Sequence, residues 1–336
     1  MFKHDVPRVR PGMFIERVIG PKFADILRGV KHRISRAVRL FSDYVSCRMI
    51  CLTRRAGFES RYCNLGETDG RKARVITIMP CYNHLEYTKQ AVDSYYKSLD
   101  GANNHVLVII DDCSTDGTKD FFLGEGRRHA NMCYFRYKAN LGLTQAWNDG
   151  VRFAVSRLAA DYIILANSDI IIPKGSIERI IRVFRENAGV GVVGVLTNGY
   201  MMCHKKQDIR LYCPGYAPSE DAADIEDVSE RVKGNKPVPA DVDAHGFFWC
   251  FTREACAKNV FFRFPRPYYF DPSRKNFGNE VEFQMRLRKT GLKTLIAADV
   301  FVFHYTDVSQ ERFPEGMENV FRLGKVKGRG QSDAKK

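Results

Sequence analysis

The chain has 336 residues, of which 44% are apolar and 27% charged, so it is long enough for one large domain or two small ones around a sizeable core. Its net charge of +14 is uneven: Lys and Arg outnumber Asp and Glu by 17 to 7 in residues 1–74 and by 7 to 3 in residues 312–336, but residues 75–311 hold 29 of each. The neutral middle argues against a nucleic-acid groove, and the basic flanks indicate an acidic surface as their partner.

The cysteines and the N-terminus indicate a reducing compartment. None of the 10 cysteines forms a C-x-x-C pair, which argues against a zinc knuckle. The first ten residues contain no apolar segment of the kind found in signal peptides, so we expect reduced thiols and a cytoplasmic location. No apolar stretch approaches the roughly 20 residues that span a bilayer.

The N-terminal flank, residues 1–73, is predicted to be a basic arm followed by a linker. Residues 1–20 look extended, and residues 22–52 carry apolar side chains at helical spacing opposite a face of Lys and Arg. This basic amphipathic helix either packs on its own domain or attaches to an anionic membrane surface or a partner. Residues 57–72, with three glycines and mixed charges, look like the linker.

From residue 74 onward, short apolar runs alternate with segments of helical spacing. Strands are predicted at residues 75–79, 106–110, 132–137 and 162–166, and helices at 85–99, 118–123 and 143–158. This alternation predicts an α/β domain with a mixed, mostly parallel sheet flanked by helices. We assign the domain to residues 74–310, with halves 74–200 and 201–310, followed by a basic tail at 311–336.

The second half of the domain is less regular. Residues 189–194 match G-x-G-x-x-G, but a helical pattern precedes them and a β-like run contains them, so we reject a dinucleotide site. Residues 203–243 look like a long surface loop. A helix is predicted from Asn279 to near Gly291, and a last strand at residues 300–305.

Polar clusters follow the predicted strands of the first half. They are Pro80 to Asn83, Asp111-Asp112, Asn140, and Asn167-Ser168-Asp169. Open α/β sheets bind ligands at the carboxyl ends of their strands, so these clusters predict a binding site. The alternative explanation is the ordinary polarity of turns.

Four segments in this order resemble the family 2 glycosyltransferases of GT-A fold. They are Val75 to Asn83, Ile110 to Thr118, Asn140-Leu141-Gly142 and Asn167-Ser168-Asp169, of which Asp-Asp-x-Ser-Thr-Asp-Gly-Thr is the most specific. The resemblance covers roughly residues 75–310 and is strongest over 75–185. It implies a nucleotide-diphosphate sugar as donor.

The resemblance also assigns donor-binding residues, among which ionised carboxylates accept hydrogen bonds. They are Pro80, Tyr82 and Asn83 in the nucleoside pocket, Asp111 and Asp112 at the base and ribose, Asn140 and Gly142 near the diphosphate, and Asn167 and Ser168 after the fourth strand.

A divalent metal is implied as cofactor. Asp169 matches the last member of the family's D-x-D metal motif, while Asn167 replaces the first and leaves one charge fewer. His304 matches a position that often supplies a metal-binding histidine, although a strand histidine without that role is the alternative. Oxygen ligands with one imidazole suit Mn²⁺ or Mg²⁺.

Glu280 falls on the position of the catalytic base, where the family usually has Glu-Asp and this chain has Asn279-Glu280. The alternative for Glu280 is a stabilising acid in the first turn of a helix, and Glu282 is the reserve base. Trp249 and Phe248 are expected either to stack on an acceptor sugar or to pack in the core.

The sequence therefore predicts a metal-dependent, inverting glycosyltransferase acting on a glycan or lipid-linked glycan in polysaccharide biosynthesis. Residues 284–288 do not match the Gln-x-x-Arg-Trp of processive members, so one sugar is expected to be added at a time. We expect a peripheral location on the inner face of the membrane. The main alternative is a non-catalytic GT-A-fold binding or scaffold protein, which Asn167 and Asn279 favour. A nucleotidyltransferase is a further alternative, but the glycine-rich phosphate loop that it needs after the first strand is absent. A nucleic-acid binder is the last, and the absence of a reading motif counts against it.

Overall fold

A computed structural model describes residues 57–66, 74–99, 104–198, 205–240, 243–261, 266–276 and 278–305. These residues lie in a compact unit that begins at Ala56. The predicted basic helix at 22–52 and the tail at 311–336 fall outside the described residues. Within the described part, no helix combines the length and the apolar character needed to cross a membrane.

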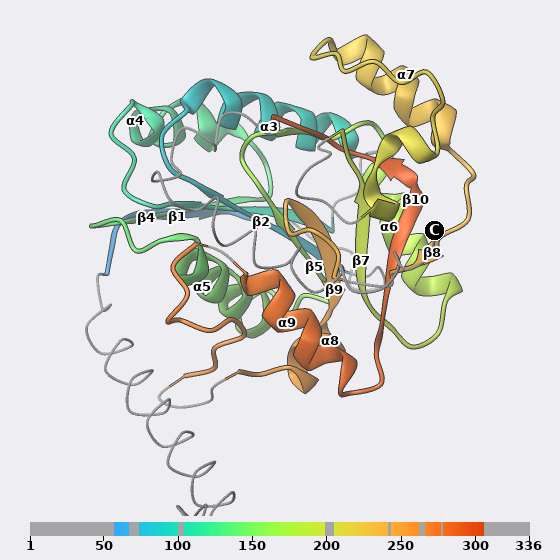
Figure 1. Ribbon diagram of the computed structural model, residues 1–336. Coiled ribbons are helices and arrows are strands. Elements are labelled where there is room, and N and C mark those ends of the chain that lie inside the picture. Colours follow the sequence, from blue (N-terminus) through green and yellow to red (C-terminus); the bar gives the residue numbers. More distant parts are fainter. Residues whose placement is uncertain are drawn as a thin grey trace, which may run out of the picture. The chain divides into compact units, whose positions relative to one another are not determined.

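The described residues build a nine-stranded sheet in the order β1-β4-β3-β2-β5-β9-β7-β10-β8 (Figure 1). Its strands are β1 (Phe58–Asn64), β2 (Val75–Cys81), β3 (His105–Asp111), β4 (Met132–Tyr137), β5 (Tyr162–Ala166), β7 (Val190–Leu196), β8 (Val238–Pro239), β9 (Phe248–Thr252) and β10 (Lys293–Phe301). A separate antiparallel pair joins β6 (Ile170–Ile171) to β11 (Phe303–His304).

Strands β4, β3, β2 and β5 run parallel, which confirms the predicted α/β class. Asp111 pairs in register with Cys81 on one side and Arg136 on the other, so the carboxyl ends of β2, β3 and β4 reach the same edge. Strand β9 runs antiparallel between β5 and β7. The polar clusters that follow the parallel strands are therefore brought together at one edge of the sheet.

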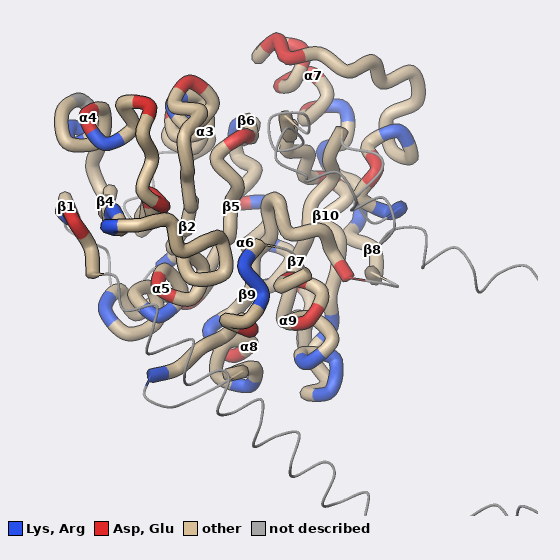
Figure 2. Tube along the Cα trace, turned by 60° about the vertical axis from the view of Figure 1, so that its left-hand side comes forward, with Lys and Arg blue, Asp and Glu red and all other residues tan. Residues whose placement is uncertain are grey.

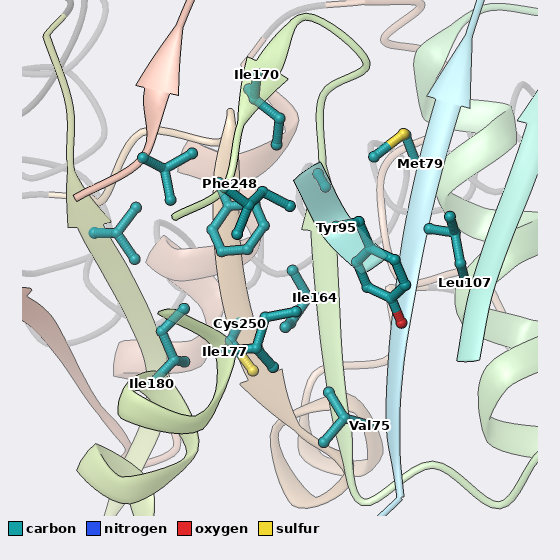
Figure 3. Close-up of a cluster of buried hydrophobic side chains, with 14 of the residues drawn as sticks. Val75, Met79, Tyr95, Leu107, Ile164, Ile170, Ile177, Ile180, Phe248 and Cys250 are labelled. Atoms are coloured by element: carbon teal, nitrogen blue, oxygen red, sulfur yellow. The ribbon is translucent and has the colours of Figure 1, made fainter. Parts of the chain in front are cut away.

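Helices cover both faces of the sheet. Helices α3 (Leu85–Ser98), α4 (Thr118–Leu123) and α6 (Ser176–Glu186) pack on one face, and α5 (Leu143–Ser156), α8 (Arg253–Lys258) and α9 (Asn279–Arg288) on the other. Figure 3 shows the first face, where Met79 and Leu107 of the sheet lie near Tyr95 of α3. On the second face, Gly150 of α5 lies so close to the sheet that a Cβ there would approach Ile78 Cγ2 to 2.5 Å.

One prediction about the second half was wrong. The presumed long loop at 203–243 contains helix α7 (Ala222–Val232), which carries several Asp and Glu residues (Figure 2). Asp221 caps this helix by accepting the backbone N–H of Ala223 at 2.8 Å. The apolar side chains of Ile225, Val228 and Val232 are buried against the sheet, so the acidic residues form the solvated face of a helix.

Two predictions about the N-terminal side were also wrong. The presumed linker contains β1, which pairs antiparallel with β4. Cys63 of β1 lies directly opposite Cys133 of β4, and the two form a disulfide, so these thiols are not reduced as expected. The other cysteines of the described residues are free thiols. By contrast, residues 190–194 lie within β7 after helix α6, which confirms the rejection of a dinucleotide-binding turn.

Candidate active site

Asp112 joins two of the predicted polar clusters. Its carboxylate accepts the backbone N–H of Leu141 at 2.6 Å and that of Gly142 at 2.8 Å. The side-chain amide of Asn140 donates to the backbone oxygen of Asp112 at 3.3 Å. Burial raises the pKa of Asp112 to about 6, although the two N–H donors and nearby Lys275 pull it down. The loop after β3 therefore holds the loop after β4 in place.

Asp111 is fully buried beneath that loop. One carboxylate oxygen accepts from Tyr134 Oη at 2.8 Å and Arg136 Nη1 at 2.6 Å, and the other accepts the backbone N–H of Ser114 at 2.7 Å. Arg136 also pairs with Glu59 of β1 at 2.9 Å. Internal partners thus surround Asp111, which supports the turn that carries Asp112.

Backbone strain marks the loops at this edge. Asn83 and His84 after β2, and Cys113 after β3, adopt left-handed φ values of 56°, 57° and 69°. Asn83 Oδ1 accepts the backbone N–H of Thr115 at 2.7 Å, and the backbone N–H of Asn83 donates to Ser114 Oγ at 2.8 Å. These bonds tie the two loops together.

Pro80 and Tyr82 lie on either side of the last residue of β2. Pro80 is buried within the strand, one residue before its end, and Tyr82 is half-buried at the start of the loop. Asn140 is exposed, whereas Gly142 is buried with a φ of +88°. The residues expected to bind the nucleotide therefore lie around one strand edge, where Asp111 is fully buried.

The structure brings Asn167 and the two predicted metal ligands, Asp169 and His304, close together. His304 Nε2 lies 3.3 Å from Asp169 Oδ1 and 3.2 Å from Asn167 Nδ2. The pairing of β6 with β11 places His304 opposite Ile170, and this brings residues more than 130 positions apart into contact. Ser168 is half-buried between Asn167 and Asp169.

The chemistry of this trio fits a weak divalent-cation site. It offers one carboxylate, one imidazole and one amide, the ligand types suited to Mn²⁺ or Mg²⁺. Among the residues that the structure describes, no cluster of three or more His, Cys, Asp and Glu is present. Asn198 was not anticipated from the sequence; it holds His304 by accepting its backbone N–H at 2.7 Å and donating to its backbone oxygen at 3.0 Å.

Glu280 lies in the first turn of α9, and its side chain is half-buried. Burial raises the pKa of Glu280, and the charge of Asp243 adds to the shift while Arg274 opposes it. Its neighbour Asn279 is fully buried, and within the described residues both of its amide atoms lack a hydrogen-bond partner. Glu282, the reserve base, pairs with Arg286 at 2.5 Å.

Two consecutive residues connect Glu280 with the Asn167–Asp169–His304 trio. A Cβ added to Gly246 would lie 3.1 Å from both Cβ and Cγ of Glu280, so the two residues are in close contact. The ring of Phe247 stacks on His304 with centroids 5.1 Å apart, and its backbone oxygen accepts the N–H of Asn167 at 2.7 Å. The candidate base and the candidate metal ligands therefore flank one short segment before β9.

His245, in the same segment, was missed by the sequence reasoning. Its ring stacks on the ring of Phe247 with centroids 5.9 Å apart. Burial, with a contribution from His304, lowers the pKa of His245 to about 4, so this imidazole is neutral near pH 7. In the sequence, His245 is notable only because it directly precedes Gly-Phe-Phe-Trp. That local pattern does not distinguish a histidine at the site from one packed in the core.

The expectation that Trp249 and Phe248 stack on an acceptor sugar is wrong in this structure. Both side chains are fully buried. Trp249 packs against Trp147 and Phe283 on one face of the sheet, and Phe248 belongs to the core on the opposite face. The alternative, core packing, is correct because consecutive residues of a strand point to opposite faces and both faces are covered by helices.

The mixed, mostly parallel sheet flanked by helices is consistent with the GT-A fold of nucleotide-sugar transferases. A model of the family described as glycosyl transferase family 2 matches residues 76–259, more than half of the chain. The chain therefore belongs to the family 2 glycosyltransferases.

Individual similar proteins are distant. The minor teichoic acid biosynthesis protein GgaB of Bacillus subtilis (strain 168) is 27% identical over 110 residues, which is 33% of this chain and 12% of that protein. The chain thus spans about an eighth of the length of this relative. Among solved structures, the mannosyltransferase PcManGT from Pyrobaculum calidifontis in complex with GDP-Man and Mn²⁺ matches with 14% identity over 86% of this chain and 70% of that chain, with a TM-score of 0.48. TarS of S. aureus matches with 16% identity over 69% of this chain and 36% of that chain, with a TM-score of 0.47.

Proposed function

We propose that the protein is an inverting glycosyltransferase that moves one sugar from a nucleotide-diphosphate sugar to an acceptor hydroxyl. The observation that carries this proposal is the contact of Gly246 with Glu280 and of Phe247 with His304. These two contacts support a site in which the half-buried carboxylate of Glu280 accepts a proton on one side of the Gly246-Phe247 segment while the Asp169–His304 pair lies on the other. A base beside a site for the departing diphosphate is what direct displacement at a sugar carbon requires.

The donor is proposed to lie along the strand edge. Tyr82, Asn83 and Asp112 would face the nucleoside, and Asn140 and Gly142 the diphosphate. Asp169, His304 and Asn167 would hold Mn²⁺ or Mg²⁺. When bound, such an ion supplies charge that stabilises the departing nucleoside diphosphate.

Glu280 is proposed to be the base. The acceptor oxygen forms a bond to the anomeric carbon from the side opposite the diphosphate, and the acceptor proton passes to Glu280. The bond from that carbon to the phosphate oxygen breaks with its electron pair on the diphosphate, and the configuration inverts. A raised pKa brings the carboxylate closer to the working pH, where general-base catalysis is most efficient.

The acceptor is proposed to be a glycan or lipid-linked glycan of a cell-wall or surface polysaccharide. The name of the Bacillus subtilis relative, a minor teichoic acid biosynthesis protein, supports this context. Gln284 exchanges two 2.8 Å hydrogen bonds with the backbone of Ala244 and so has a structural role, which supports the addition of single sugars. Residues 22–52 are proposed to bring the enzyme to an anionic membrane surface.

The test is hydrolysis of a panel of nucleotide sugars with and without Mn²⁺ by wild type, Asp169→Ala and Glu280→Gln. Glu282→Gln serves as the matched control because Glu282 is the neighbouring acid of the same helix. We expect slow hydrolysis of one donor that is lost in Asp169→Ala and Glu280→Gln but kept in Glu282→Gln. A donor that binds without being hydrolysed would instead favour the non-catalytic binding protein, with Asn167 and Asn279 as its explanation.

A further inference from the structure

Two adjacent cations, Arg274 and Lys275, reach the candidate site on a loop whose backbone is fixed to the start of α5. The backbone oxygen of Lys275 accepts the N–H of Thr144 at 3.1 Å and its hydroxyl at 3.0 Å, and that hydroxyl also donates to the backbone oxygen of Arg274. Asn276 Oδ1 accepts the backbone N–H of Leu143 at 3.2 Å. We call residues 274–276 the cationic loop. Its anchors join the second half of the domain to the first.

The stem of Lys275 lies on the loop that Asp112 holds. A Cβ added to Gly142 would lie 2.5 Å from Lys275 Cγ and 3.0 Å from its backbone oxygen, so only glycine leaves room for the lysine. The charge of Lys275 acts on Asp112, whose pKa it lowers. Lys275 is exposed, and among the described residues its ammonium group has no ion-pair partner. An exposed lysine therefore stands beside the loop expected to face the diphosphate.

Arg274, the first residue of the cationic loop, lies near the start of α9, which carries the candidate base Glu280. Its Nη1 atom lies 2.9 Å from the position that a Cβ of Gly278 would occupy, directly before α9. Its charge lowers the pKa of Glu280. Its ion pair with Asp271 is long, at 3.9 Å, and its side chain is 48% exposed. Lys275 is therefore the cation near Asp112, and Arg274 is the cation near Glu280.

We propose that Lys275, together with Arg274, binds the diphosphate of the sugar donor and stabilises it as it departs. This inference rests on the proposed function. A nucleoside diphosphate gains negative charge when the bond to the anomeric carbon breaks, and that charge needs positive groups nearby. Because Asn167 carries no charge where the family motif has a carboxylate, we expect a cation to be held there less strongly, and the lysine and arginine of a loop with an anchored backbone supply part of the missing charge. Guanidinium and ammonium groups are the phosphate-binding side chains of proteins.

The test is calorimetric titration of the full chain with UDP, GDP, CDP and dTDP, and with the matching nucleoside monophosphates, with and without Mn²⁺. We compare wild type with Lys275→Ala, Lys275→Arg and Arg274→Ala. Lys289→Ala is the control, because Lys289 is an exposed lysine at the end of α9. We expect Lys275→Ala to weaken binding of the preferred diphosphate about tenfold, the size expected for one lost charge-assisted contact, and to leave the monophosphate within about twofold. Lys275→Arg retains most of the affinity.

The outcomes separate this inference from the proposed function. If wild type binds a nucleoside diphosphate and Lys275→Ala binds it equally well, the role of Lys275 is refuted while the transferase proposal stands. If wild type binds none of the diphosphates, the proposed function fails and the inference with it. Equal loss of mono- and diphosphate binding would also overturn the inference, because it would mean that the loop shapes the nucleoside pocket.

Discussion

Gly246 leaves no room for a side chain beside Glu280, since a Cβ at residue 246 would approach the Cβ and Cγ of Glu280 to 3.1 Å. Gly246→Ala must therefore push the Glu280 side chain by a few tenths of an ångström. We expect donor hydrolysis to fall roughly tenfold, because small displacements of a catalytic group are costly. Gly57→Ala is the control, as nothing lies within 4 Å of its Cβ position. Unchanged turnover in Gly246→Ala would contradict the placement of the base.

The pH dependence of turnover is expected to report the environment of Glu280. Because burial raises its pKa above the ordinary 4.5, Glu280 becomes protonated, and thus inactive as a base, at a higher pH than an exposed glutamate. The acid limb of kcat, measured at saturating donor, should accordingly lie above pH 4.5 and disappear in the residual activity of Glu280→Gln. An acid limb that survives in Glu280→Gln would assign the base to another group.

Asp112 is expected to make folding stability depend on pH in the reverse of the usual carboxylate sense. Its folded pKa of about 6 exceeds the ordinary 3.8, so between these values the folded state keeps a proton that the unfolded state has released. Stability contributed by this group is present below pH 3.8 and is lost as the pH rises through about 6. Urea unfolding at several pH values between 3.8 and about 6 should show a smaller loss of the free energy of unfolding in Asp112→Asn than in wild type. Identical slopes in the two proteins would disprove the burial effect.

Restoring a carboxylate at residue 167 is expected to strengthen metal binding. Asn167 lies 3.2 Å from His304 Nε2, so Asn167→Asp would add a charged ligand beside Asp169 and His304. We expect the affinity for Mn²⁺, measured by electron paramagnetic resonance of the free ion, to rise about tenfold, since ligand charge tunes such sites. Asn187→Asp, at the end of α6, adds the same charge elsewhere in the protein and should leave the affinity for Mn²⁺ unchanged. An unaltered affinity in Asn167→Asp would show that the trio does not bind the ion.

Trp249 is expected to matter for stability and not for acceptor binding. Because it is fully buried, Trp249→Ala should lower the free energy of unfolding by about 3–5 kcal/mol, measured by urea denaturation. Leu211→Ala, at a residue 63% exposed, is the control and should cost less than about 0.5 kcal/mol. Normal stability with a raised KM for the acceptor would restore the stacking role.

Much of the sheet could be predicted because its strands are continuous apolar runs. The predicted bounds 132–137 and 162–166 agree with β4 and β5, while β2 extends two residues past the predicted end, to Cys81. Strand β1 was missed because it is partly exposed and carries polar residues, and helix α7 was missed because few of its residues are apolar. Strand β1 depends on its pairing with β4, and α7 on burial of three side chains against the sheet.

The sequence by itself determined the order of strands and helices, the polar residues at the strand ends and the family to which they belong, because periodicity and local motifs record which residues each segment buries. The tertiary structure alone decided which of those residues meet. Asp169 contacts His304 only because β6 pairs with β11, and Lys275 stands beside Asp112 only because its loop is anchored to α5. The tertiary structure also decided that Trp249 belongs to the hydrophobic core. Contacts between residues far apart in the chain depend on packing between segments, which no local pattern encodes.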